Sequence, residues 1–151
     1  AARTKSEAMM DSITFFVPLP PPACRSNSRA FWAAKVKAKQ AYSEAVYAAA
    51  VGTLSGRVGI ALASAVAPWQ RARVTYTWRY CGVAPDLGNL GANTKALQDI
   101  LCMAPKTRQA NGTTYLGLIE DDKGITPVYE LEKVKHKADE GVLVTILKGE
   151  A

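Results

Sequence analysis

The chain has 151 residues, of which 48% are hydrophobic and 21% are charged, and its formal net charge is +6. This length and composition are typical of one globular domain with a buried core, and we expect a soluble protein. Lysines and Glu44 interrupt the Ala-rich stretch 30–51, so no apolar run reaches the roughly 20 residues that a membrane-spanning helix needs. The positive charge, with a pI near 9.3, favours a polyanionic partner such as nucleic acid.

The cysteines argue against a metal or disulfide framework. Cys24, Cys81 and Cys102 are widely spaced, they form no Cys-x-x-Cys pair, and His136 is the one histidine of the sequence. A zinc site needs a tighter set of ligands, and a disulfide framework needs an even number of cysteines. We therefore expect three reduced thiols in a cytoplasmic protein.

The N-terminal region predicts a tail followed by a strand. Residues 1–12 carry no apolar signal core and are expected to be a loose tail, so that the folded domain spans residues 13–151. Residues 13–17 form a β-type run that stops at Pro18 and at the prolines 20–22. Proline cannot donate a ladder hydrogen bond, and the chain is expected to leave the sheet there.

A long amphipathic helix is predicted for residues 30–50. Its apolar side chains recur at near-helical spacing: Phe31, Val36, Tyr42, Ala45, Val46 and Ala49. Glycines at positions 52, 56 and 59 are expected to end this helix.

The clearest strand covers residues 71–80. Apolar side chains occupy the even positions from Ala72 to Tyr80, whereas the odd positions carry Arg71, Arg73, Thr75, Thr77 and Arg79. One face of the strand is therefore expected to be buried. The arginine face fits contact with DNA and fits an ordinary solvated sheet face equally well.

The next helix is predicted from the spacing of Leu90, Thr94, Leu97 and Leu101, which share one helical face. Asp86 and Asn89 are expected just before it. Lys95 and Asp99 are four residues apart on another face, where a plain ion pair is also expected, and we assign Asp99 a structural role.

An acidic cluster, residues 120–122, precedes Lys123-Gly124 and predicts a turn before a later strand. Residues 104–117 are rich in turn formers and predict a loop. Two strands are then expected at 126–138 and 142–147, joined as a hairpin by residues 139–141. His136 falls in the first of them, where we expect an exposed edge and no chemistry. The order of elements predicts an α/β fold, a single domain with a mixed β-sheet and helices packed on it.

These residues resemble the RusA family of Holliday-junction resolvases. That family carries an Asp-x-Asp-Asn-Leu element, then a helix with a Lys and an Asp one turn apart, then a loop with an Asp-Asp pair. The resemblance extends from Ile13 to Leu147, and Asn27 fits an Asn that follows the family's first strand. The matching positions of the motif are Asp86, Asn89-Leu90, Lys95, Asp99 with Leu101, and Asp122.

The resemblance implies a RusA-like homodimer that resolves four-way DNA junctions by paired nicks. It further implies a metal-dependent endodeoxyribonuclease of recombination or repair, often in a phage setting, with Mg²⁺ or Mn²⁺ as cofactor. Asp86, Asp122 and Lys95 would be catalytic, and Asp86, Asp122 and Asp121 would hold the metal. One position departs from the motif, because Gly88 stands where the family has its second Asp.

Such residues suit phosphodiester cleavage. A divalent cation activates water and stabilises charge on the phosphoryl oxygens, and Mg²⁺ needs only one or two carboxylates. Glu120 or Asp121 would then replace the missing ligand, and the amide oxygen of Asn89 would bond a metal-bound water. A lysine at the scissile phosphate would stabilise the negative charge that develops in the transition state.

We expect basic residues to contact the DNA backbone, without base readout. They are Arg25, Arg29, Arg71, Arg73, Arg79, Lys106 and Arg108. One alternative is a junction- or duplex-binding protein of the same fold that has lost cleavage because of Gly88. Another is a basic structural or protein-interaction domain whose acidic turns are only caps.

Overall fold

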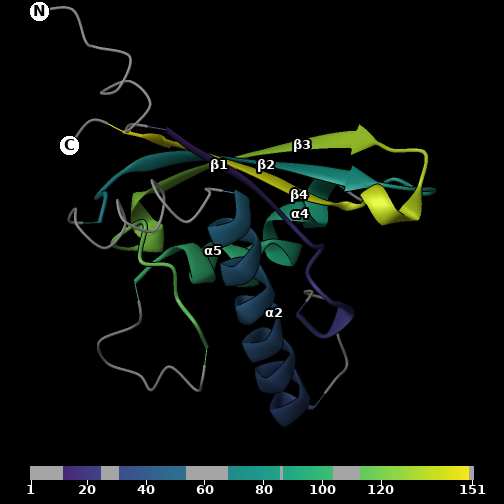
Figure 1. Cartoon of the computed structure of the whole chain (residues 1–151), viewed down its shortest axis with the longest axis horizontal. Helices are drawn as coiled ribbons and strands as arrows, with labels where there is room; N and C mark the ends of the chain where they lie inside the picture. Colours follow the sequence, from purple (N-terminus) through teal and green to yellow (C-terminus); the bar gives the residue numbers. More distant parts are fainter. Residues whose placement is uncertain (1–11, 25–30, 54–67, 86, 104–112, 150–151) are drawn as a thin grey trace, which may run out of the picture.

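The computed structural model describes residues 12–24, 31–53, 68–85, 87–103 and 113–149 (Figure 1). The α/β class with a mixed sheet and packed helices is confirmed. The elements in chain order are β1 (Ser12–Val17), η1 (Pro22–Cys24), α2 (Trp32–Thr53), β2 (Ala72–Tyr80), α4 (Leu87–Asn93), α5 (Lys95–Leu101), η2 (Asp122–Gly124), β3 (Ile125–Lys133), η3 (Lys137–Asp139) and β4 (Gly141–Lys148).

The four strands form one sheet in the order β1-β4-β2-β3. β4 is antiparallel to both of its neighbours, whereas β2 and β3 are parallel. Helices α4 and α5 connect these two parallel strands, as a crossover between parallel strands requires. The last strand of the described chain therefore lies inside the sheet, between β1 and β2.

The predicted hairpin between the last two strands is wrong. β2 lies between β3 and β4, and the short connection through η3 passes the end of the sheet instead of forming a two-strand turn. The physical reason is burial: Val142, Val144 and Ile146 are fully buried, which a strand achieves best with a neighbour on each side. The preceding strand ends at Lys133, so the exposed His136 lies after it, in the connection.

The sheet has one covered face and one open face. Alternate side chains of β2, Val74, Tyr76 and Trp78, are buried on the face where the described helices lie (Figure 1). On the opposite face the strand register aligns Arg73 with Thr126 on one side and with Leu147 on the other. Within the described residues no helix covers this second face.

The long helix is confirmed as α2, although its ends and its apolar face differ from the prediction. Tyr42, Val46 and Ala50 are buried, whereas Phe31 is 87% exposed and precedes the helix. The helix continues through Gly52, because one helical glycine costs only about 1 kcal/mol and does not by itself end a helix.

The single helix predicted for residues 90–101 is two helices, α4 and α5, with Thr94 between them. The predicted position of Asn89 before the helix is wrong, because this residue lies within α4. The described helices include none that is both long and apolar enough to cross a bilayer.

Candidate functional site

The start of α5 is fixed by a buried hydroxyl. Thr94 donates a hydrogen bond from Oγ1 to the Leu90 carbonyl oxygen (2.6 Å) and accepts one from Trp78 Nε1 (3.0 Å). This links the junction between the two short helices to the central strand β2. Lys95 is the next residue and the first of α5, so these hydrogen bonds also fix the position of its backbone.

The turn that carries the acidic cluster is held by the neighbouring backbone. Leu118 N–H donates to the Leu101 carbonyl (3.0 Å), and Glu120 N–H donates to the Trp69 carbonyl (2.9 Å). Asp121 then caps the short helix η2, because its Oδ1 accepts a hydrogen bond from Lys123 N–H (3.1 Å). The turn thus brings Asp122 back alongside the first residue of α5.

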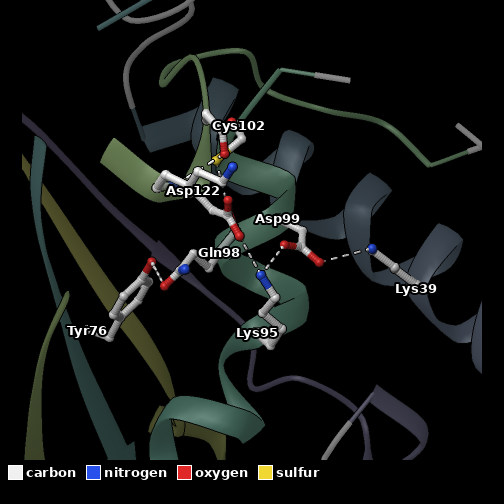
Figure 2. A network of polar contacts seen from close by, with 9 residues as sticks. Lys39, Tyr76, Lys95, Gln98, Asp99, Cys102 and Asp122 are labelled. Atoms are coloured by element: carbon white, nitrogen blue, oxygen red, sulfur yellow. Dashed lines mark hydrogen bonds and ion pairs between the residues drawn. The ribbon is translucent and has the colours of Figure 1, made fainter. Parts of the chain in front are cut away.

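Lys95 lies between two carboxylates (Figure 2). Its Nζ is 2.7 Å from Oδ2 of Asp122 and 3.0 Å from Oδ1 of Asp99. The second oxygen of Asp99 accepts a hydrogen bond from Lys39 Nζ at 3.3 Å. A chain of alternating charges therefore joins α2, α5 and η2.

The electrostatics of this chain stabilise its charged forms. The hydrogen bond from Lys95, followed by the neighbouring Asp121 carboxyl, lowers the pKa of Asp122 below 3.8. Partial burial lowers the pKa of Lys95, but its hydrogen bonds to Asp122 and Asp99 outweigh this and raise the pKa to about 12. Lys95 and Asp122 are thus both ionised at neutral pH.

Uncharged side chains lie beside the charged cluster, on the side toward the sheet (Figure 2). Tyr76 donates a long hydrogen bond to Gln98 Oε1 (3.4 Å) and stacks on Tyr129 with ring centroids 5.6 Å apart. Burial first, and then the nearby carboxylates, raise the pKa of the Cys102 thiol to about 12. This cysteine therefore stays protonated and is a poor nucleophile and a poor metal ligand at neutral pH.

The carboxylate oxygens at this site are the type of ligand that a hard divalent cation prefers. Asp121 and Asp122 are adjacent at the exposed end of the site, and Oδ2 of Asp122 is paired with Lys95. The described residues contain no group of three or more His, Cys, Asp and Glu side chains that is able to hold a metal ion. A metal held here would rely on one or two carboxylates, with water or phosphate oxygens completing its shell.

The structure brings together two of the three predicted catalytic residues, Lys95 and Asp122, with Asp121 next to them. Asp86 lies outside the described residues, so the structure gives no distance between its carboxylate and that of Asp122. Asp99, to which we assigned a structural role, is part of the same cluster and holds Lys95 from the other side.

The predicted DNA contacts divide into three groups. Arg71 and Arg73 are exposed on the open sheet face. Arg79 is partly neutralised, because its Nε lies 3.3 Å from Glu132 and its guanidinium lies 5.3 Å from the ring centroid of Phe16. The remaining four lie outside the described residues: Arg25, Arg29, Lys106 and Arg108.

Sequence reasoning missed Lys39, which is 60 positions away from its partner Asp99. It also missed Gln98 and Tyr76, which join the site to the sheet. No local pattern signals such long-range pairs. The one available signal was that Lys39 falls near the middle of a helix with a buried face, where the long side chain of a lysine reaches a neighbouring element.

Comparison of the chain with protein-family models, with curated proteins and with solved structures found no match. The geometry of the site and the resemblance of its residues are therefore the basis for a functional assignment.

Proposed function

We propose that the protein is a metal-dependent, structure-selective endodeoxyribonuclease that cleaves branched DNA, with the four-way junction as its substrate. The observation that carries the proposal is the 2.7 Å contact between Lys95 and Asp122, two motif residues that are 27 positions apart in sequence. A resemblance by chance gives no reason for these two side chains to meet. The same cluster contains a third motif residue, Asp99.

The roles follow from charge and position. Asp122, assisted by Asp121, would hold a divalent cation, and Asp86 would supply a further carboxylate as the residue directly before α4. Mg²⁺ or Mn²⁺ bound there would supply Lewis-acid stabilisation of the phosphoryl oxygens. Lys95 is half exposed, with 53% of its side-chain surface accessible, so its ammonium group is able to reach a phosphate.

Lys95 has a second task in this proposal. Its ammonium group lies between Asp122 and Asp99, and its positive charge reduces the repulsion between these two carboxylates. The same exposed ammonium group would contact the scissile phosphate of a bound DNA and would stabilise the negative charge that develops there. Asp99, held by Lys39, would keep the Lys95 side chain within reach of the site.

The test is nicking of a synthetic four-way junction in Mg²⁺ and in Mn²⁺, with binding measured separately in EDTA. We expect Asp122→Asn and Asp86→Asn to abolish nicking while junction binding in EDTA is retained. Removing the charge in Lys95→Met should lower the nicking rate about 100-fold, as for the loss of one transition-state hydrogen-bond donor. Cleavage at the wild-type rate by Asp122→Asn would contradict the site assignment.

A second candidate function is DNA binding without cleavage. Two observations favour it. The described residues hold no cluster of three metal-ligating side chains, and Gly88 stands where the motif has a carboxylate. Binding of junctions in EDTA with no nicking in either metal would select it. In that case Gly88→Asp, which restores the carboxylate, is expected to raise metal affinity, and isothermal titration with Mn²⁺ would measure the change.

The proposed assembly is a homodimer, because a four-way junction has near two-fold symmetry and needs two matched nicks. Sedimentation of the free protein and of its junction complex tests this point separately from cleavage.

A further inference from the structure

A cationic groove lies at the end of the sheet where β2 and β3 begin and β4 ends. It encloses about 620 Å³. Four positively charged residues line it: Arg71, Arg73, Lys123 and Lys148. We refer to this feature as the sheet-end groove.

Among the described residues, no acidic side chain lines the sheet-end groove, and its four cations form no ion pair with a carboxylate. By contrast, Lys39, Lys95 and Arg79 are all paired. Four unpaired like charges around one hollow repel one another, which costs free energy unless an anion binds between them. The charges in the groove therefore favour an anionic occupant.

Close backbone contacts give the groove a defined shape. The N–H of Gly149 donates to the Arg71 carbonyl at 2.8 Å, which holds the end of β4 against the start of β2. Gly124 passes so close to the residue before Arg71 that a Cβ atom on it would lie 1.9 Å from the Gln70 carbonyl oxygen. The start of β3 is thus held against the same strand, and the cations are anchored on backbone that does not need to rearrange.

We propose that the sheet-end groove binds the phosphodiester backbone of a DNA duplex arm. Arginine presents a planar fork of donors that matches phosphate oxygens, and Arg71 and Arg73 supply two of these. Thr126, paired in register with Arg73, adds a hydroxyl donor. The described residues that line the groove include no aromatic side chain, and so offer none of the stacking platforms that single-stranded DNA binders use.

The groove is also joined to the candidate site by a single turn. Asp121, Asp122 and Lys123 are consecutive, and Asp122 contacts Lys95 while Lys123 lines the groove. A duplex backbone held in the groove would therefore approach Asp122. This inference goes beyond the proposed cleavage function, because the groove needs neither the carboxylates nor a metal ion to bind DNA.

The experiment is fluorescence anisotropy of a labelled duplex with the full chain in EDTA over a series of salt concentrations. The test variant is Arg71→Gln with Arg73→Gln, and the matched control is Lys133→Gln with Lys135→Gln. The control removes the same charge from exposed residues at the opposite end of β3. Circular dichroism and thermal unfolding verify that each variant folds as the wild type does.

We expect the groove variant to weaken duplex binding at least about tenfold and to reduce the slope of log K against log salt by about two, one for each lost phosphate contact. The control should change both by much less. If the arginine variant does not fold, Lys123→Gln with Lys148→Gln removes charge from the same groove and is expected to have the same effect.

Equal losses in the groove variant and the control would overturn the proposal, because they would show binding to net charge alone. Tighter wild-type binding to polyglutamate, or to vesicles that contain phosphatidylserine, than to the duplex would overturn it in favour of a protein or lipid partner. Since all binding is measured without metal, loss of nicking in Asp122→Asn leaves this result unchanged, and the two proposals fail independently.

Discussion

At the scale of single residues, the charge state of the site depends on the two ion pairs that Lys95 forms, with Asp122 and with Asp99. Its ammonium group contacts Asp122 at 2.7 Å and Asp99 at 3.0 Å, and Lys39 contacts Asp99 at 3.3 Å, so two cations face the two carboxylates. Both partners are partly exposed, and water and salt therefore screen the pair, whose contribution to stability is at most about 1 kcal/mol. The contact therefore matters more for the placement of the two side chains than for the stability of the fold.

The pKa of Asp122 in metal-free protein tests this account. Because Lys95 holds this pKa below 3.8, the pair stabilises the folded state above pH 3.8, and this contribution is lost as the pH falls through the folded-state pKa. Lys95→Met is expected to raise the pKa of Asp122 toward its ordinary value. A carboxyl ¹³C NMR titration in EDTA measures the change, with Lys135→Met as the control. An unchanged titration in Lys95→Met would contradict the assignment.

At alkaline pH, the contribution of Lys95 to the stability of the fold depends on pH with the opposite sign. The pKa of Lys95 rises from 10.5 to about 12 in the folded protein, so its contribution is complete below pH 10.5 and is lost as the pH rises through about 12. Between these two limits the ion pair of Lys95 with Asp122 is intact, and neither of these two groups titrates near neutral pH. Any pH dependence of nicking near pH 7 must therefore come from another group.

At the scale of secondary-structure elements, the junction between α4 and α5 positions the site. Thr94 is fully buried and its hydroxyl makes two hydrogen bonds, one within the helical segment and one to Trp78 on β2. If this hydroxyl is removed, the buried indole N–H loses the acceptor that it has among the described residues. The position of Lys95 therefore depends on a contact between a helix and the sheet.

Thr94→Val keeps the shape of the side chain but leaves Trp78 Nε1 without its acceptor. We expect a loss of about 1–3 kcal/mol in the free energy of unfolding, the usual cost of an unpaired buried polar group. Urea denaturation followed by tryptophan fluorescence measures it. Thr94→Ser, which retains the hydroxyl, should lose clearly less. A valine variant as stable as the serine variant would show that this hydrogen bond is unimportant.

At the scale of the whole molecule, the sheet is organised around β4. This strand pairs with β1 on one side and β2 on the other, and Val142, Val144 and Ile146 are fully buried. Within the described part of the chain β3 is an edge strand that pairs with β2 alone, and many of its side chains are exposed. Resistance to local opening should therefore be greatest at the centre and least at the β3 edge.

Native-state hydrogen exchange checks this order. We expect the amides of β4 to exchange only through global unfolding, while outward-facing amides of β3 exchange faster. Ile146→Ala should lower the free energy of unfolding by about 2–5 kcal/mol and speed exchange throughout β4 accordingly. Faster exchange in β4 than in β3 would contradict the central role of β4.

The sequence by itself was sufficient for the class of fold and for most of its elements. Strand alternation in β2 follows directly from its residues, because every second side chain is apolar, and the acidic turn before β3 follows from its composition. These features depend on local backbone geometry, which neighbouring residues determine. The resemblance predicts that Lys95 and Asp122 belong to one site, and the two side chains are in contact in the structure.

Tertiary structure alone decided the order of the strands and the partners of the charged residues. No local pattern shows that β4 lies between β1 and β2, because strand pairing depends on which buried surfaces fit together in space. The same holds for Lys39 with Asp99 and for the four cations of the sheet-end groove. Their side chains meet because packing of the sheet and helices brings distant segments into contact. The energy of an ion pair depends on the distance between the charges in space, which their separation in sequence does not determine.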